Sequence, residues 1–358
     1  MTNYDVCIVG GGPAGTLLAY LLAKKQISTL LIERTSSIAK SFRGEHINEE
    51  GEKVLKNHNL FEAIEAYGLL KMESLEYWHE GKIIKQISPD PTIGHLSMHV
   101  PQAHLLQAIL DKALSLPHFN YILESRVSNL LYNEVGMCCG VQVVQKDKIL
   151  SIPAKLVVGA DGRYSTIRKL ANIESEKRKH GYDLLWARIP APKDWTPSIK
   201  MALIEGYQLS IFSQVNDFIQ IGWNIEPGSF PTLRQQPFEQ LTNKLITAFP
   251  QLKETITHHI TSWNDFVLLD VFSSTSENWG DNGIVLIGDA AHTMTPTGAF
   301  GLNSALKDAD ILAEALTLNT FDVFSSECAT QRKKEIERIQ AIQIEKEKSF
   351  SSNFYISQ

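Results

Sequence analysis

The sequence predicts an α/β fold of the Rossmann type, with a smaller β-sheet domain formed by intervening segments. Apolar runs end in glycine turns at three widely separated places in the 358-residue chain, 10–15, 159–162 and 288–289. Between the last two turns, stretches of alternating apolar and polar residues are typical of β-hairpins. A parallel sheet assembled from distant segments explains the first observation, and an inserted antiparallel sheet explains the second.

The first glycine turn has the spacing of a nucleotide-binding fingerprint. Residues 4–10 predict a buried strand, and Gly10, Gly12 and Gly15 follow the G-x-G-x-x-G pattern. Gly10 allows a tight turn, Gly12 lets the backbone approach a pyrophosphate, and Gly15 lets the next helix pack close. A plain glycine turn in a βαβ unit would leave this spacing unexplained.

The helix after this turn is predicted to begin at Pro13 and to end near Lys25. Its first amides, including that of Ala14, would face the phosphates with the positive end of the helix dipole. A second apolar strand ends in Glu33, 18 residues past Gly15 and close to the ~20 expected for an acid that binds a ribose diol. Glu33 argues against a 2′-phosphate, and Arg34 beside it completes this predicted part of the site.

Two further motifs follow predicted strands. Residues 156–168 predict a buried strand, an Asp161-Gly162 turn and a helix capped by Ser165, a pattern that an ordinary strand–turn–helix junction also explains. Gly288 and Asp289 stand at the carboxyl end of the strand 283–287, where ligands bind in such sheets. The loop 296–303 then opens onto a helix over 304–316.

With these motifs in this order, the chain resembles the class A FAD-dependent aromatic monooxygenases, the p-hydroxybenzoate hydroxylase-like flavoproteins, from Tyr4 to about residue 320. The resemblance implies an FAD-binding Rossmann-like domain of that family with an inserted β-sheet substrate domain. It implies FAD as the cofactor and NAD(P)H as a transient electron donor. The expected reaction is hydroxylation of an aromatic or polyketide-like small molecule through a flavin C4a-hydroperoxide.

The resemblance also suggests roles for the residues around the flavin. Asp161 would lie near the pyrophosphate, and Asp289 would contact the ribityl chain. A helix N-terminus stabilises the negative charge that the N1–C2 edge gains on reduction. We therefore expect the amides of Leu302 and Asn303 to contact that edge and Pro296 to line the flavin. Gly301 in the same loop is also expected to bind the cofactor. The family often has glycine where Phe300 stands, which bears on the mobility of the loop and flavin.

Four further residues belong to the predicted site or its loops. Arg43 resembles a family arginine beside the flavin, although a surface helix cap also explains it. His46 is a candidate base toward a phenolic substrate, whereas His292 is expected to be a hydrogen-bonded element of the Gly-Asp loop. Gln102 stands where many relatives carry an arginine that contacts FAD, and an amide can still donate a hydrogen bond.

The substrate domain is expected to contribute a flat, half-apolar wall. The stretches 208–212 and 218–223 predict a hairpin, and Phe212 and Trp223 are candidates for that wall, although ordinary sheet core explains them equally. The predicted domains are 1–75, 98–175 and 266–358 for FAD, and 76–97 and 176–265 for substrate. Near the end, 331–348 predicts a charge-rich helix with an apolar stripe that covers the core or a partner.

Composition limits the partners and the compartment. A net charge of −6 favours neither nucleic acid nor an anionic membrane, and apolar runs are far shorter than the ~18 residues that span a bilayer. The predicted strand at Tyr4 leaves no room for a signal peptide. The four cysteines lack C-x-x-C spacing and fit a reduced, cytoplasmic protein, and the histidines lack metal-ligand spacing. We expect a small-molecule substrate and no metal, with the oligomeric state open.

Two other functions remain open at this stage. One is an FAD-dependent oxidoreductase without oxygen insertion, such as a reductase of a polyprenyl double bond. The other is a non-catalytic flavin-binding pathway protein, since fold alone does not fix function. A flavin halogenase would carry a W-x-W-x-I-P segment, whereas residues 186–190 have one of the tryptophans.

Overall fold

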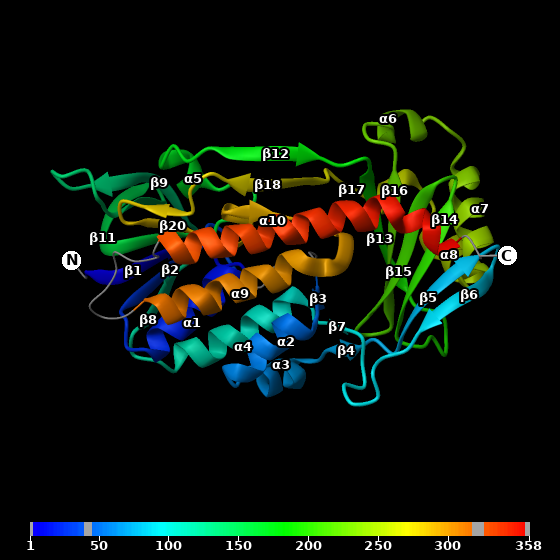
Figure 1. Ribbon diagram of the computed structural model, residues 1–358, viewed down its shortest axis with the longest axis horizontal. Helices are drawn as coiled ribbons and strands as arrows, with labels where there is room; N and C mark the ends of the chain where they lie inside the picture. Colours follow the sequence, from blue (N-terminus) through cyan, green and yellow to red (C-terminus); the bar gives the residue numbers. More distant parts are fainter. Residues whose placement is uncertain (1–2, 39–44, 317–325, 355–358) are drawn as a thin grey trace. The chain divides into compact units, whose positions relative to one another are not determined.

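A computed structural model describes residues 3–38, 45–316 and 326–354, and the chain divides into two compact units (Figure 1). Unit 1 consists of Met1–Gly68, Val100–Arg178 and Ser273–Ala341, and unit 2 of Leu69–His99, Lys179–Phe272 and Ile342–Gln358. The predicted α/β fold, with a Rossmann-type parallel sheet and a β-sheet formed by intervening segments, is confirmed. The predicted boundaries of an FAD domain and a substrate domain remain a prediction.

The centre of unit 1 is a sheet whose main strands run parallel. Its order is β19-β20-β11-β1-β2-β8, and β1, β2, β8, β11 and β20 pair in parallel. Their bounds are β1 (Tyr4–Val9), β2 (Thr29–Ile32), β8 (Phe119–Ile122), β11 (Lys148–Gly159), β19 (Gly280–Asp281) and β20 (Ile284–Leu286). The long β11 also pairs antiparallel with β10 (Cys138–Gln145), which pairs with β9 (Ser125–Tyr132). Residues 6–9 of β1, residues 30–32 of β2 and all of β20 are apolar and buried, because both faces of a parallel sheet are covered.

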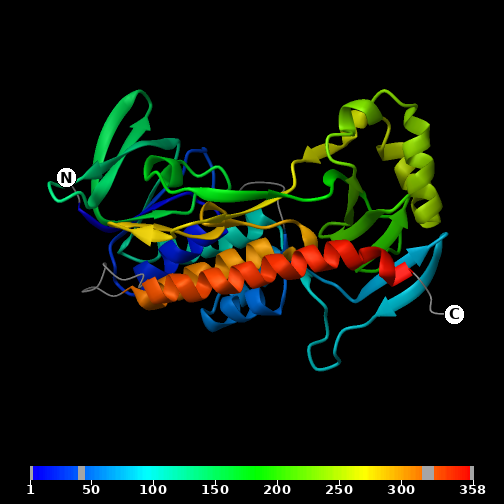
Figure 2. The ribbon, with the colours of Figure 1, turned by 45° about the horizontal axis from the view of Figure 1, so that its top comes forward.

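Helices pack on this sheet. The bounds in unit 1 are α1 (Pro13–Lys24), α2 (Glu49–Asn57), α3 (Phe61–Tyr67), α4 (Gln102–Leu114), α5 (Thr166–Leu170) and α9 (Phe300–Ala315). Helix α10 (Ser326–Ser349) begins in unit 1, and both views show its first turns running beside α9 (Figures 1 and 2). Ile336 of its apolar stripe is fully buried in the core of unit 1, so the stripe covers core there.

Unit 2 is built on a mostly antiparallel sheet with the order β17-β13-β16-β15-β14-β5-β6. The bounds are β5 (Ser74–His79), β6 (Lys82–Ile87), β13 (Asp183–Pro190), β14 (Ser198–Ile204), β15 (Tyr207–Gln214), β16 (Phe218–Ile225) and β17 (Val267–Leu269). The predicted hairpin is confirmed as the antiparallel pair β15–β16. One face of the sheet packs against α7 (Phe238–Ala248) and α8 (Lys253–His259).

Shorter elements complete the chain. They are α6 (Phe230–Leu233), β3 (His46–Ile47), β4 (Leu70–Lys71), β7 (Met98–His99), β12 (Ser175–Lys179), β18 (Phe272–Ser276), β21 (His292–Thr293), and 3₁₀ turns at Pro250–Leu252, Trp263–Asp265, Gly288–Ala290, Thr297–Ala299 and Phe350–Phe354. Among the described residues, none of the helices is both long and apolar enough to cross a membrane.

A buried ion pair lies on the helix-covered face of the unit 2 sheet. Lys200 on β14 is directly opposite Glu76 on the parallel strand β5, and its Nζ lies 2.7 Å from Glu76 Oε2. The ammonium also lies 4.8 Å from the ring centroid of Trp195 and 5.3 Å from that of Trp78. Both charged side chains are more than nine-tenths buried, so this cross-strand pair fixes the β5–β14 register.

Lys200→Met is predicted to lower the free energy of unfolding by about 3 kcal/mol or more, because it leaves Glu76 buried without its counter-charge. Denaturant unfolding of the purified protein measures the change. The control is Lys244→Met, which removes an exposed pair with Glu205 at the same 2.7 Å distance and should cost less than about 1 kcal/mol. Equal costs for the two variants would contradict the prediction.

Candidate active site

Three adjacent parallel strands bring the three predicted motifs to one edge of the unit 1 sheet. Strand β11 pairs with β1 on one side and with β20 on the other. Their carboxyl ends lead into Gly10, into Asp161-Gly162 and into Gly288-Asp289. Two backbone hydrogen bonds continue the pairing into the turns, from Ala160 N–H to Val9 O at 2.8 Å and from Ile287 N–H to Gly159 O at 3.0 Å. This edge is where doubly wound sheets bind ligands.

Two glycines of the first turn have no room for a side chain, whereas the third faces open space. At Gly10, whose φ is +109°, an added Cβ would lie 2.4 Å from Ala160 O, and at Gly15 it would lie 2.0 Å from Gly10 O. These two glycines are required by the packing of the protein itself. At Gly12 an added Cβ would meet no described atom within 4 Å, so this residue opens onto space in front of α1.

The start of α1 suits an anionic group. Gly12 is the N-cap residue and has no side chain to cap the helix, and Pro13 occupies the first turn. The amides of this turn therefore point toward the open space with the positive end of the helix dipole behind them. A cradle with this backbone and this opening fits the pyrophosphate of FAD.

Glu33 is held at the carboxyl end of β2, beside the glycine turn. It is buried, its Oε2 accepts from Gly11 N–H at 2.7 Å, and its Oε1 accepts from the amide and hydroxyl of Thr35 at 3.0 and 2.8 Å. These contacts fix the carboxylate next to the cradle, as a ribose-binding acid requires. Arg34 follows it on the exposed surface.

Asp161 has a contact that the sequence analysis missed. Its carboxylate accepts from Ser165 Oγ at 2.5 Å and from the amides of Thr166 and Ile167 at 2.6 and 3.2 Å, so it caps α5. Ser165 in turn accepts from Arg168 N–H at 3.0 Å, which confirms the predicted N-cap. Burial raises the pKa of Asp161 and outweighs these hydrogen bonds. The aspartate therefore shapes its own turn, and its contact with the pyrophosphate stays a prediction.

Arg168 connects the second motif to the third. Its buried guanidinium donates to Ala290 O at 2.7 Å and to Arg163 O at 2.9 Å, and burial lowers its pKa. Arg163 Nε lies 3.9 Å from Asp289 Oδ2. The role of Arg168 could not be predicted from the sequence, because an arginine on a short predicted helix is typical of the surface and its partner Ala290 lies far along the chain.

A second buried charge, Asp308 on α9, holds the other end of the same turn. Its Oδ2 accepts from Gly288 N–H at 2.8 Å and lies 2.7 Å from His292 Nε2. Its Oδ1 accepts from Arg332 Nε at 2.7 Å. Burial disfavours the charge, but His292 and Arg332 outweigh it and lower the pKa of Asp308 to about 2. The expectation that His292 is a hydrogen-bonded element of this loop is confirmed.

The loop before α9 has its left-handed backbone at residues other than Phe300, and the expectation about mobility stays a prediction. Phe300 has right-handed helical dihedrals, so a glycine there is not required by the backbone. The left-handed residue is Ala299, with φ +55°, after Gly298 with φ +77°. The ring of Phe300 lies over Gly298, where an added Cβ would come within 2.5 Å of it. The conformational restriction in this loop therefore lies at Ala299 rather than at Phe300.

The side chain of Asn303 links the first turn of α9 to neighbouring segments of the chain. Its Nδ2 donates to Ala299 O at 2.7 Å and to His46 O at 3.1 Å, and its Oδ1 accepts from Asn48 N–H at 3.1 Å. The side chain thus holds α9 against β3 and the start of α2. The backbone of this turn carries the predicted flavin contacts.

The remaining predicted residues are placed as follows. Pro296 is exposed at the start of the loop, Gly301 and Leu302 are half-buried in the first turn of α9, and His46 is half-buried on β3. Gln102 is buried at the start of α4, and its backbone N–H donates to Glu45 Oε1 at 3.3 Å. Arg43 lies outside the described residues.

The structure does not bring Phe212 and Trp223 together. In the β15–β16 pairing, Phe212 lies opposite Gln220 and Trp223 lies opposite Leu209, so the two rings point to opposite faces. Trp223 belongs to the core beneath α7 and α8, and its assignment to a substrate wall is corrected. Phe212 is half-buried on the face away from that core.

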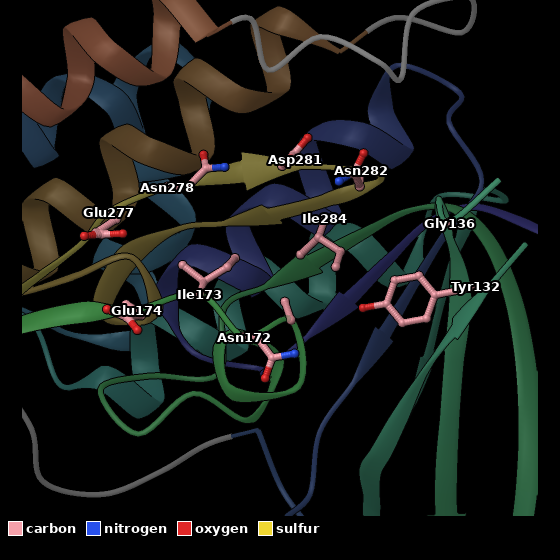
Figure 3. Close-up of a pocket in the computed structure, with 11 residues that line it drawn as sticks. Tyr132, Gly136, Asn172, Ile173, Glu174, Glu277, Asn278, Asp281, Asn282 and Ile284 are labelled. Carbon is pink, nitrogen blue, oxygen red and sulfur yellow. The ribbon is translucent and has the colours of Figure 1, made fainter.

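A polar cavity of about 290 Å³ lies elsewhere in unit 1. Tyr132, Asn172 and Asn282 are among its lining residues, and Figure 3 shows their side chains with those of three carboxylates around it. None of the residues that line it is among the predicted site residues.

The glycine turns, the uncapped helix start and the fixed glutamate at one sheet edge define a dinucleotide-binding flavoprotein. Residues 3–320 match the model of the FAD binding domain family, and the chain belongs to that family. It is 31% identical over 350 residues to 6-methylpretetramide 4-monooxygenase of Streptomyces rimosus, a match that covers 95% of this chain and 82% of that one. It is therefore an FAD-dependent monooxygenase with NAD(P)H as the electron donor, which confirms the predicted enzyme class and cofactors.

Two other comparisons describe the range of the family. The chain is 27% identical over 329 residues to digeranylgeranylglycerophospholipid reductase 1 of Methanococcoides burtonii, covering 87% of this chain and 73% of that one. Among solved structures, the probable FAD-dependent monooxygenase PqsL from Pseudomonas aeruginosa has the same fold, with a TM-score of 0.82 at 19% identity over 98% of this chain and 96% of that one. PqsL has also been solved in complex with 2-aminobenzoylacetate.

Gly12→Ala is predicted to raise the dissociation constant for FAD at least a hundredfold, because the added methyl group enters the space that the pyrophosphate needs. The stability of the FAD-free protein should fall by no more than about 1 kcal/mol, since the methyl meets no protein atom. Fluorescence titration with FAD and denaturant unfolding measure the two effects. Gly181→Ala, whose methyl also enters open space, is the control and should bind FAD normally. Unchanged affinity in Gly12→Ala would place the pyrophosphate elsewhere.

Ala299→Gly is predicted to raise the free energy of unfolding by about 0.5 kcal/mol, because glycine relieves the left-handed strain but adds freedom to the unfolded chain. The matched control is Ala341→Gly, at an exposed position within α10, which should lower it by about 1 kcal/mol. Thermal and denaturant unfolding distinguish the two signs. If both variants are destabilised equally, Ala299 carries no strain that glycine relieves.

Proposed function

We propose that this monooxygenase hydroxylates a flat, electron-rich aromatic or polyketide-like small molecule. The observation that carries the proposal is the meeting of three glycine turns at one edge of the unit 1 sheet, in a chain whose relative acts as 6-methylpretetramide 4-monooxygenase. When bound, FAD supplies the redox chemistry, taking electrons from NAD(P)H and passing one oxygen atom of O2 to the substrate. The protein supplies binding, orientation and exclusion of water.

Each part of the sheet edge has a proposed role toward the cofactor. The amides at the start of α1 hold the pyrophosphate, and Glu33 accepts from a ribose hydroxyl. Asp289 binds the ribityl chain, beside Arg163. The amides of Leu302 and Asn303 stabilise negative charge at the N1–C2 edge, because they lie at the positive end of the α9 dipole.

We assign substrate recognition to the face of the unit 2 sheet that lies away from its helices. In addition to Phe212, this face carries Trp186 on β13, which lies opposite Gly222 on β16. An aromatic ring on such a surface can stack against a flat substrate. An added Cβ at Gly222 would lie 2.9 Å from Ser210 Oγ and 3.6 Å from Trp186 Nε1. The glycine therefore leaves room beside the Trp186 ring on this face of the sheet.

A chain of hydrogen bonds orients an amide on the same face. Arg188 Nε donates to Gln214 Oε1 at 2.8 Å, and Gln214 Nε2 donates to Gln220 Oε1 at 2.7 Å. The arginine has no acceptor, so it fixes which end of each amide donates. The next donor in the chain is the NH₂ group of Gln220, which suits a carbonyl or phenol oxygen of the substrate.

The named ligands of related proteins support this substrate class. The relative from Streptomyces rimosus is named for 6-methylpretetramide, and PqsL has been solved with 2-aminobenzoylacetate. The digeranylgeranylglycerophospholipid reductase among the relatives is the specific reason to keep reduction of a double bond as the second candidate.

A panel of aromatic and polyphenolic compounds is predicted to contain ligands that stimulate NAD(P)H oxidation at least tenfold and that gain one ¹⁸O atom from ¹⁸O₂. Gln220→Leu should raise KM for such a ligand about tenfold or more, because it removes the oriented donor while leaving FAD affinity unchanged. Gln240→Ala, at an exposed position on α7, is the control.

The outcomes distinguish the candidates. Reduction of an isoprenoid double bond without ¹⁸O uptake would replace hydroxylation by the reductase function. Binding of FAD without ligand-stimulated turnover across the panel would contradict the proposed substrate class. Gln220→Leu with unchanged KM would remove this face from substrate recognition.

A further inference from the structure

The backbone of the Gly288–Ala290 turn is held by two buried charges of opposite sign. Asp308 accepts the Gly288 N–H, and Arg168 donates to Ala290 O, at 2.8 and 2.7 Å. Gly288 has φ +58°, a left-handed conformation that its neighbours must maintain. Both charged side chains are at least 95% buried, at 4% and 5% exposed. The turn that presents Asp289 therefore depends on groups that lie behind it.

Asp308 keeps its charge beside two partners, His292 on β21 and Arg332 on α10. Arg332 is 2% exposed, its Nε donates to Asp308 Oδ1 at 2.7 Å, and its NH2 group donates to Ser304 O at 3.1 Å. Arg332 is therefore joined to α9 at two points, one turn apart. Removing one member of a buried pair leaves the other charge uncompensated, which costs far more than removing both.

Further ion pairs join the facing surfaces of α9 and α10. Arg332 Nη1 also lies 2.7 Å from Glu335 Oε2. Lys307 binds Glu335 and, at 2.5 Å, Glu50 on α2. These alternating charges fix the rotation of α10 about its axis, so that Arg332 faces Asp308 rather than solvent.

We propose that Arg332 is a positioning residue for FAD: through Asp308 it fixes the Gly288 amide, and with it the turn that carries Asp289. The last long helix of the chain thereby acts on cofactor affinity without touching the cofactor. Beside His292 and Arg332, the Asp308 carboxylate keeps its charge in the folded protein until pH falls through its lowered pKa of about 2.

The test uses four variants of the purified protein: Arg332→Met, Arg332→Lys, the double variant Asp308→Asn with Arg332→Met, and the control Arg338→Met at an exposed position on α10. Two readouts are measured, the FAD dissociation constant by fluorescence titration and the hydrogen-exchange rate of the Gly288 amide by NMR. Neither needs a substrate, so the result is independent of the proposed hydroxylation.

Arg332→Met is expected to raise the FAD dissociation constant and the Gly288 exchange rate at least tenfold. The double variant should return both to within about threefold of wild type, because the amide oxygen that Asp308→Asn introduces still accepts from Gly288 and no charge is left unpaired. Arg332→Lys should recover part of the loss, and Arg338→Met should change neither value. A folded Arg332→Met with affinity within twofold of Arg338→Met would overturn the proposal.

If Arg332→Met does not fold, two charge-free double variants replace it. Arg332→Met combined with Asp308→Asn keeps an acceptor for Gly288, whereas Arg332→Met combined with Asp308→Ala does not. The alanine form is expected to bind FAD at least tenfold more weakly and to exchange the Gly288 amide faster. Equal affinities in the two forms would overturn the proposal, since the amide contact would then not position the turn.

Discussion

Parallel pairing of β1, β11 and β20 is the constraint on which the candidate site depends. Parallel neighbours end at the same edge of a sheet, so turns from residues 10, 160 and 288 adjoin although long segments separate them. Gly10 and Gly15 serve this packing because a side chain there would collide with backbone, whereas Gly12 leaves an opening. Contacts within the protein therefore determine the backbone at Gly10 and Gly15, and the open space for a ligand lies at Gly12.

Buried charges around this edge give the turns fixed conformations. Asp161 caps α5, Arg168 holds Ala290, and Asp308 holds Gly288. Buried charges contribute little net stability even where they are paired, since desolvation offsets most of the attraction. Their value here is geometric, because each one fixes a backbone amide or carbonyl next to the ligand-binding edge. A core of apolar side chains in the same places would pack equally well but would leave the left-handed turn without a partner.

The sequence allowed prediction of features that depend on neighbouring residues. The βαβ unit, the Ser165 cap and the β15–β16 hairpin follow from local pattern, and all three are confirmed. Contacts between distant segments could not be predicted. Arg332 stands one turn before Ile336 on the apolar stripe, whereas the exposed Arg338 stands off it, so the pattern predicts burial of Arg332 but not its partner Asp308, which lies 24 residues earlier. The prediction for Trp223 was wrong because the alternation of residues along a strand separates the two faces of the sheet but does not indicate which face the helices cover.

The start of α9 shows how a local exception is sustained by distant contacts. Ala299 adopts the left-handed conformation without being glycine, which costs about 1 kcal/mol or more. Its carbonyl accepts from Asn303, whose side chain also binds His46 and Asn48. At Gly51 in α2 a Cβ would lie 2.1 Å from Asn303 Oδ1, so a helix glycine is needed for this side chain to reach its partners. The hydrogen bonds of the Asn303 side chain therefore maintain the left-handed conformation of Ala299. They also orient the backbone amides at the start of α9 that are proposed to face the flavin.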